Sequence, residues 1–256
     1  MRRWLALGAV GVCGLSMGGC PIDQILDGIL NGILDGIGND NDNNNDNDND
    51  NDNDNDNSGG DEARLRVVHL SPDAPRVDVC ADGARLFSGL DFGDVSDYET
   101  VDAGEYVVTV VEDGDSCAST GLIDADLDLP EGTDTTVVAI DLADSLSLLV
   151  LDDDNRSPAL GFAALRFVHA SPDAPLVDVT FVDGETLFND VDFGEVGDYV
   201  ALPAGAYDLD LRDSTGAVIA LTIEGLELES RGVYTLYASG LVEGSPALDL
   251  IVSQDN

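Results

Sequence analysis

The feature that most constrains the fold of this chain is an internal repeat with a period of about 100 residues, a length that is too long for a solenoid unit and fits whole domains. The longest repeated string is LRVVHLSPDAPRVDV at 65–79, which returns as LRFVHASPDAPLVDV at 165–179. Two shorter strings keep the same register: DFGDVSDY at 91–98 against DFGEVGDY at 192–199, and AGEY at 103–106 against AGAY at 204–207. We therefore expect two homologous domains in one chain.

The expected boundaries follow from the repeat and from the polar segment between its copies. The first domain covers 62–154, the second covers 163–256, and the linker covers 155–162. Inside each copy the apolar runs are short, alternate with polar residues and are bounded by Gly, Pro and Asp, which is typical of strands with one face in a core. Several such runs in each copy predict an all-β fold: two tandem β-sandwich domains of immunoglobulin-like size.

The combination of these strings resembles a known family. The pattern V-H-x-S-P-D-A-P-x-V-D-V, followed by F-G-x-V-x-x-Y and A-G-x-Y, is similar to the prokaryotic domain of unknown function 4397, and both copies carry it in full. The resemblance implies a secreted or surface-attached β-sandwich that often occurs in tandem. It implies no activity, so no functional residue is transferred.

The amino terminus is typical of an export signal. Two Arg residues precede an apolar stretch that ends at Cys20, and the stretch is too short to span a membrane as a helix. The string MGGC at 17–20 resembles the lipobox at which prokaryotic lipoproteins are cleaved and acylated on Cys. We expect a signal peptide over 1–19 and lipidation of Cys20; the alternative is an ordinary signal with an incidental Cys. Pro21 after the Cys favours the outer surface of the envelope over retention at the inner membrane.

Two segments separate Cys20 from the first domain. Residues 20–37 place Ile and Leu at helical spacing but include three Gly, so they predict either an amphipathic leader lying on the bilayer or a disordered one. Residues 38–61 are almost entirely Asn, Asp and Gly, and no apolar side chain is present to offset chain entropy. We expect a disordered acidic tether there, with weak cation binding at most.

The charge of the chain excludes one class of partner. The formal net charge is −42, from 52 acidic and 10 basic residues, and all ten basic residues are Arg. Eleven of the acidic residues precede residue 61, so the two domains remain strongly acidic by themselves. Nucleic-acid binding depends on neutralising phosphates with Lys and Arg, so we expect no nucleic-acid partner. The expected partners are the membrane, through the lipid anchor, and other envelope proteins or glycans.

Cys80 and Cys117 are present in the first copy and have no counterpart in the second. Two thiols that are present together and absent together in an exported protein predict a disulfide bond.

The repeated His-Ser-Pro-Asp string is the one set of residues that invites a chemical role. His69 and His169 share strand parity with apolar residues, which predicts inward imidazoles bonded to loop backbone. The Ser in the string lies in a Pro-rich turn and lacks the Gly-flanked elbow of a nucleophile, so we predict no catalytic residue and no metal centre. A calcium or ligand site remains the alternative to a structural loop; its candidate residues are Asp73, Asp78, Asp173 and Asp178.

These expectations give a non-enzymatic, surface-displayed lipoprotein that acts as a binding or structural module of the cell envelope and needs no cofactor. Its ligand is not specified by the sequence. One alternative is a passive acidic coat component, and a remote one is an envelope hydrolase.

The density of negative charge predicts how stability responds to salt. Self-repulsion destabilises a compact acidic domain and is screened by ions, with a Debye length of about 10 Å at 0.1 M salt. We expect the melting temperature of the folded part to rise with added sodium chloride, and more steeply with calcium chloride. Calorimetry across an ionic-strength series checks this, and an unchanged melting temperature contradicts it.

Overall fold

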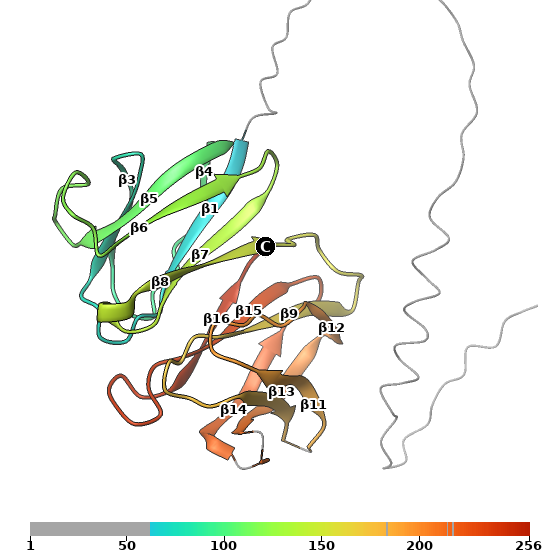
Figure 1. The fold of residues 1–256 in the computed structure, drawn as a ribbon. Coiled ribbons are helices and arrows are strands. Elements are labelled where there is room, and N and C mark those ends of the chain that lie inside the picture. The colour runs from blue at the N-terminus through green and yellow to red at the C-terminus, as the bar shows by residue number, and fades with distance from the viewer. Residues whose placement is uncertain (1–61, 183, 214, 217) are drawn as a thin grey trace, which may run out of the picture. The chain divides into compact units, whose positions relative to one another are not determined.

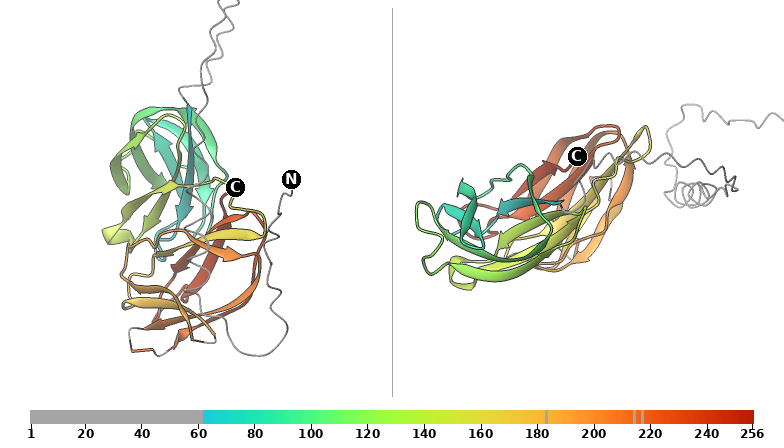
Figure 2. Two further views of the ribbon diagram at one scale, coloured as in Figure 1. Left: turned by 90° about the vertical axis from the view of Figure 1, so that its right-hand side faces the viewer. Right: turned by 90° about the horizontal axis from the view of Figure 1, so that it is seen from above.

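The computed structural model describes residues 62–256, apart from 183, 214 and 217. The predicted signal, Cys20, the leader and the tether lie outside these residues. In the described part, the regular structure is sixteen strands and one short 3-10 helix, η1 (Ala143–Ser145). The strands of 62–154 and those of 162–256 form two separate groups, cyan to yellow-green and yellow-brown to red in Figure 1, and they are also separate in the left view of Figure 2. Both groups belong to one compact unit of the chain.

The first repeat contains eight strands in two four-stranded sheets. One sheet has the order β4-β1-β7-β8 and the other β3-β2-β5-β6. The strands are β1 (Glu62–His69), β2 (Val77–Ala81), β3 (Ala84–Leu90), β4 (Glu99–Asp102), β5 (Gly104–Glu112), β6 (Ile123–Leu129), β7 (Asp134–Ile140) and β8 (Ser147–Asp153).

The second repeat has the same topology, with sheets β12-β9-β15-β16 and β11-β10-β13-β14. Its strands are β9 (Phe162–His169), β10 (Val177–Phe181), β11 (Thr186–Val191), β12 (Val200–Pro203), β13 (Gly205–Asp213), β14 (Val218–Leu228), β15 (Val233–Ser239) and β16 (Asp249–Gln254). Each strand of one repeat thus has a counterpart eight places away in the other. The predicted all-β fold with two tandem β-sandwiches is confirmed.

Alternation of apolar and polar residues builds a core between the two sheets of each repeat. In β6, Leu127 and Leu129 are buried while the aspartates between and before them are exposed. The first core also takes Leu65 and Val67 from β1 and Val79 from β2. Their counterparts Leu165, Phe167 and Val179 lie in the core of the second repeat. Each repeat therefore buries its own apolar centre.

Local turn chemistry closes the β2–β3 hairpin of the first repeat. Its two-residue loop is Asp82-Gly83, and both residues have positive φ, 48° and 78°. Positive φ at both central positions is the signature of a type I′ turn, for which Asp-Gly is a preferred sequence because glycine has no Cβ to clash.

The central strands β1 and β7 are buried on both faces. They run parallel to each other, with Val68 opposite Val138. Residues 65–69 of β1 and 135–140 of β7 are all buried. One face packs in the core of the first repeat, and the other contributes Val68 and Val138 to a third apolar cluster that also contains Val168 and Tyr237 of the second repeat. The two repeats therefore share an interface.

The predicted disulfide is confirmed: Cys80 of β2 is bonded to Cys117, with a Cα–Cα distance of 5.8 Å. Cys117 lies in the loop between β5 and β6, so the bond fastens that loop to the centre of the sheet.

Loss of this bond is expected to destabilise the protein. A disulfide that closes a loop of 37 residues stabilises by about 4 kcal/mol in the chain-entropy model. We predict that the Cys80→Ala/Cys117→Ala double variant unfolds at a lower urea concentration than the parent. Urea denaturation measures this, and the parent protein with its disulfide reduced serves as the control that should match the double variant. Equal stability of parent and double variant contradicts the prediction.

Candidate functional site

The two His-Ser-Pro-Asp strings occupy equivalent places, at the end of β1 and β9 and in the loops that lead to β2 and β10. His69, Ser71, His169 and Ser171 are buried, whereas Asp73 and Asp173 are exposed. The polar atoms of these loops thus divide into a buried set and an exposed set, which form different contacts.

Each buried imidazole is bonded to the backbone of its own loop. The Nε2 atom of His69 lies 3.1 Å from the carbonyl oxygen of Pro75, and Nε2 of His169 lies 3.2 Å from that of Pro175. A carbonyl only accepts, so Nε2 carries the proton. In the second repeat, Nδ1 of His169 accepts the amide of Ser171 at 3.3 Å. The prediction of an inward imidazole bonded to loop backbone is confirmed for both copies.

Burial sets the protonation state of these rings. Desolvation lowers the pKa of His69 and of His169 below the usual value, and the hydrogen bonds to Pro75 and Pro175 offset part of this effect. Both imidazoles are therefore neutral at pH 7.

The hydroxyl of Ser171 is also hydrogen-bonded within its own repeat. It donates to the carbonyl of Gly240 at 2.7 Å and lies 3.4 Å from Oδ1 of Asp173. His169 meets the amide of Ser171 and not this hydroxyl. The bonds in this loop are therefore not those of a nucleophile activated by a base, which would require the imidazole to accept the hydroxyl proton.

The exposed aspartates of these strings connect two loops of the same repeat. The carboxylate of Asp73 accepts the amide of Ala143 at 2.7 Å. The carboxylate of Asp173 accepts the amides of Val242 and Glu243 at 2.8 and 3.0 Å. Burial acts to raise the pKa of Asp173, but the backbone amides outweigh it and the pKa lies below the usual range. Each carboxylate therefore fastens the loop after β7 or β15.

The other two candidate ligands serve different loops. Asp78, whose side chain is fully buried, accepts the amides of Gly89 and Gly114 at 2.7 and 3.0 Å and pairs with Arg85 at 3.0 Å. Burial acts to raise its pKa, but these amides and the guanidinium lower it below the usual range. Asp178 accepts the amide of Asp190 at 2.7 Å. The structure thus assigns the four candidate aspartates to separate internal contacts.

The described residues 62–256, with their three gaps, contain no group of three or more His, Cys, Asp or Glu side chains placed to hold a metal ion. In the same part of the chain, no helix has the length and apolar character needed to cross a membrane.

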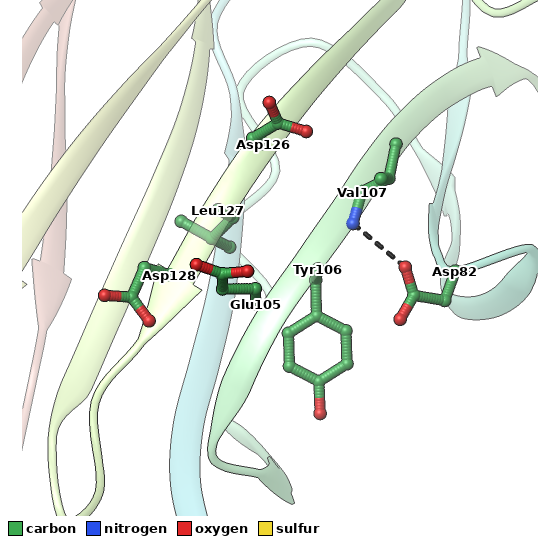
Figure 3. A pocket seen from close by; sticks show the side chains of 7 residues that line it. All are labelled: Asp82, Glu105, Tyr106, Val107, Asp126, Leu127 and Asp128. Carbon is green, nitrogen blue, oxygen red and sulfur yellow. Dashed lines mark hydrogen bonds between the residues drawn. The ribbon is translucent and has the colours of Figure 1, made fainter.

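A shallow hollow lies over β5 and β6 of the first repeat. The ring of Tyr106 and the carboxylates of Asp82, Glu105, Asp126 and Asp128 line it (Figure 3), and Val107 donates its amide to Asp82 at 3.0 Å. Glu105 and Asp128 are direct cross-strand partners. Like charges placed opposite each other destabilise a sheet. The negative charge of this surface therefore lowers the stability of the first repeat.

In the described part of the chain, the two ion pairs that are buried at both partners lie between the repeats. Arg66 of β1 pairs with Asp255 at 2.8 Å, and Arg166 of β9 pairs with Asp153 at the end of β8. The arginine side chains are 2% and 3% exposed, and both aspartate side chains are 0% exposed. Arg66 and Arg166 are equivalent positions, and so are Asp153 and Asp255. Each repeat therefore supplies one arginine and one aspartate to a reciprocal pair of contacts, which we call the double Arg–Asp contact.

Each aspartate of the double Arg–Asp contact is held in place by its own repeat. Asp153 accepts the hydroxyls of Thr136 and Tyr98 at 2.5 and 2.6 Å. In the second repeat, Asp255 accepts the hydroxyl of Thr235 at 2.6 Å, and that of Tyr199 lies 3.4 Å away. A carboxylate fixed in this way presents its remaining oxygen in a defined direction.

The arginines are positioned by the same side chains. Nε of Arg66 donates to Thr136 at 3.0 Å, and Nε of Arg166 donates to Thr235 at 2.7 Å. The guanidinium carbons lie 4.6 and 4.8 Å from the ring centres of Tyr98 and Tyr199, a distance at which cation–π attraction contributes. Desolvation is thus offset by an ion pair, a hydrogen bond and an aromatic face at each arginine.

Sequence reasoning did not find this interface. The available signal was the presence of Arg66 and Arg166 at the same interior strand position, next to runs such as VVHL that lack alternation and are typical of strands buried on both faces. The pairing is not visible in any local pattern, because Asp255 lies at the other end of the two-domain part from Arg66 and Asp153, although only 13 residues before Arg166, belongs to the other repeat.

The fold and this interface define a class: a tandem pair of β-sandwiches joined through a shared buried face. The family model described as "Domain of unknown function (DUF4397)" matches residues 63–180 and 177–256. The chain belongs to this family, and the suspected resemblance is confirmed. The two matches meet within β10.

A search of curated proteins found no match. Among solved structures, one described as the Bacillus anthracis TIE protein is similar to this chain, with a TM-score of 0.23 and 11% sequence identity. The similarity covers 71% of this chain and 34% of that chain, so this protein spans about a third of that structure's length.

The buried histidines predict a pH dependence. Their lowered pKa means that the unfolded state, with a histidine pKa of about 6.5, binds protons first as the pH falls. Stability is therefore complete above pH 6.5 and declines as the pH drops below it. We expect the His69→Gln/His169→Gln variant, whose amides can still donate to the loop carbonyls, to lose this decline between pH 7 and 5. Urea denaturation at several pH values checks it, and an unchanged slope in the variant contradicts it.

The loop contacts predict a graded cost. Asp173→Ala removes the acceptor for two amides, whereas Asp73→Ala removes the acceptor for one. An amide that loses its partner costs about 1–3 kcal/mol when it is shielded from water, and less at an exposed loop. We expect Asp173→Ala to destabilise by roughly 1–2 kcal/mol and Asp73→Ala by less, measured by denaturation. Equal stability of both variants and the parent contradicts a loop-fastening role.

Proposed function

We propose that this protein is an exported, lipid-anchored, non-catalytic module of the cell envelope. It is held to the membrane through Cys20 and presents its tandem β-sandwiches at the end of an acidic tether on the outer surface. It works by binding other envelope components or by structural support, and it uses no cofactor.

The observation that carries this proposal is the use of the repeated His-Ser-Pro-Asp side chains. His169 bonds to the backbone at both ring nitrogens, Ser171 donates to a carbonyl, and Asp173 accepts two amides. A catalytic group needs a free face toward substrate. These groups of the second copy are bonded within their own repeat, and in the first copy Nε2 of His69 and the carboxylate of Asp73 are bonded in the same way, which supports a structural role for the repeated string. The disulfide between Cys80 and Cys117 supports export, because such bonds persist in oxidising compartments.

The distribution of charge supports contact with cations or basic partners. Seven of the eight arginines in the described part of the chain form ion pairs with aspartates of the same chain: Arg64, Arg66, Arg76, Arg85, Arg156, Arg166 and Arg212. Most carboxylates have no such partner, so the surface offered to the surroundings is strongly negative. The same observation favours the second candidate function, a passive acidic coat component.

Anchoring is tested by the Cys20→Ser variant expressed with the wild-type chain as control. We expect the wild type to incorporate an alkyne-tagged fatty acid, to partition with membranes and to be removed from intact cells by external protease. The variant should incorporate no label and appear in the soluble or secreted fraction. Equal labelling of both proteins, or protection of the wild type from external protease, contradicts the proposal.

Binding is separated from a passive role by the mature, detergent-solubilised protein. Glycan arrays and pull-downs from envelope fractions, each with and without calcium, should return a saturable partner if the module binds. Blank results together with altered electrophoretic mobility of cells lacking the protein favour the coat function. Turnover in a broad hydrolase screen contradicts both.

A further inference from the structure

The double Arg–Asp contact is self-complementary. Exchanging the two repeats maps Arg66 onto Arg166, Asp153 onto Asp255 and Val68 onto Val168, so each repeat presents the same charged residues and the same central valine to the other. This is the property of an isologous interface, the kind that joins two identical subunits about a two-fold axis.

The apolar part of the interface also takes residues from both repeats. Val68, Leu70, Val138 and Leu151 of the first repeat are buried against Val168, Ala170 and Tyr237 of the second. The turns that contain Asp-Phe-Gly, at 91–93 and 192–194, also contact the opposite repeat. Gly93 approaches the side chain of Ile251, and Gly194 approaches that of Ile140. The position of Val138 is taken by Tyr237 in the second repeat, as their pairing with Val68 and Val168 shows. The interface therefore has a buried apolar centre beside its buried ion pairs.

Part of the covalent link between the repeats lies outside these contacts. None of the residues in the third apolar cluster comes from 154–161, and Leu160 in this link is 82% exposed. At the start of the link, Asn155 donates to the hydroxyl of Tyr98 at 3.1 Å and to the carboxylate of Asp134 at 2.8 Å, so this end is bonded to the first repeat. The exposed stretch around Leu160 is therefore the place where the link can be cut without removing a residue of the buried face.

We propose that this buried face is a homotypic docking surface: its partner is an equivalent repeat, and it holds that partner without a covalent link. An unpaired repeat would leave an apolar face in water together with an arginine and an aspartate that have lost their partners, and each of these costs free energy. The link raises the local concentration of one repeat around the other, but the specificity resides in the double Arg–Asp contact. A repeat supplied by a second copy of the chain presents the same groups.

The test uses the full chain with a protease recognition sequence inserted between Ala159 and Leu160. The folded protein is cut at this site and passed over a size-exclusion column under non-denaturing conditions. We expect the two halves to co-elute at the mass of the uncut chain, and to exchange with halves of a tagged second copy on longer incubation. Halves that separate or precipitate after cutting overturn the proposal.

Three variants of the cut chain locate the specificity. Arg66→Asp places a carboxylate opposite Asp255 and should raise the concentration at which the halves dissociate by at least about 100-fold. Adding Asp255→Arg restores an opposite-charge pair and should recover most of the loss. Arg212→Met, on β13 and paired with Asp210 inside its own repeat, is the matched control and should leave dissociation unchanged.

The milder variant Asp255→Asn is measured in parallel, because Arg66→Asp alters a buried site. Intact strand content by circular dichroism, with the halves dissociating at a higher concentration than the parent, supports the proposal. If both Asp255→Asn and Arg66→Asp leave the halves associated as tightly as the parent, the buried pairs do not specify the docking and the proposal fails.

Discussion

The burial of two arginines, each paired with an aspartate of the other repeat, is the constraint around which the described part of the chain is arranged. A guanidinium removed from water is strongly destabilising unless its charge and its donors are satisfied. Arg66 and Arg166 meet this condition only while both repeats are present and correctly oriented. Two sheets, β4-β1-β7-β8 and β12-β9-β15-β16, therefore contribute residues to two apolar cores each, and we call them the inner sheets. The outer sheets, β3-β2-β5-β6 and β11-β10-β13-β14, contribute to one core each.

Much of the architecture could be predicted from the sequence because it depends on local pattern. The repeat predicted the number of sandwiches, and the alternation of apolar and polar residues predicted strands with one face in a core, as Leu127 and Leu129 of β6 show. The parity of His69 and His169 placed their rings inside, and the presence of both Cys80 and Cys117 in one copy alone predicted their bond. In each case, residues close in sequence or matched between the copies carried enough information.

The remaining features depend on contacts between distant residues. The carboxylate of Asp73 accepts the amide of Ala143, which lies in the loop that follows β7 and is distant from Asp73 in sequence. Arg66 has the same sequence environment whether its side chain points to solvent or into an interface. Only the three-dimensional arrangement shows that Asp255, at the far end of the chain, completes its site. The candidate aspartates likewise proved to serve separate loops, which no spacing rule reveals.

The reciprocal interface also accounts for where the sequences of the two repeats differ and where they are nearly identical. The strings that remain nearly identical, around 65–79 and 91–98 and their counterparts, include residues that face the other half, so a change there must suit two surfaces at once. The outer sheets answer to one core alone. There one half has acquired a cystine and a longer loop before β6, while the other has a longer β14. Substitutions on the outer sheets therefore have to suit one core, while those on the shared face have to suit two.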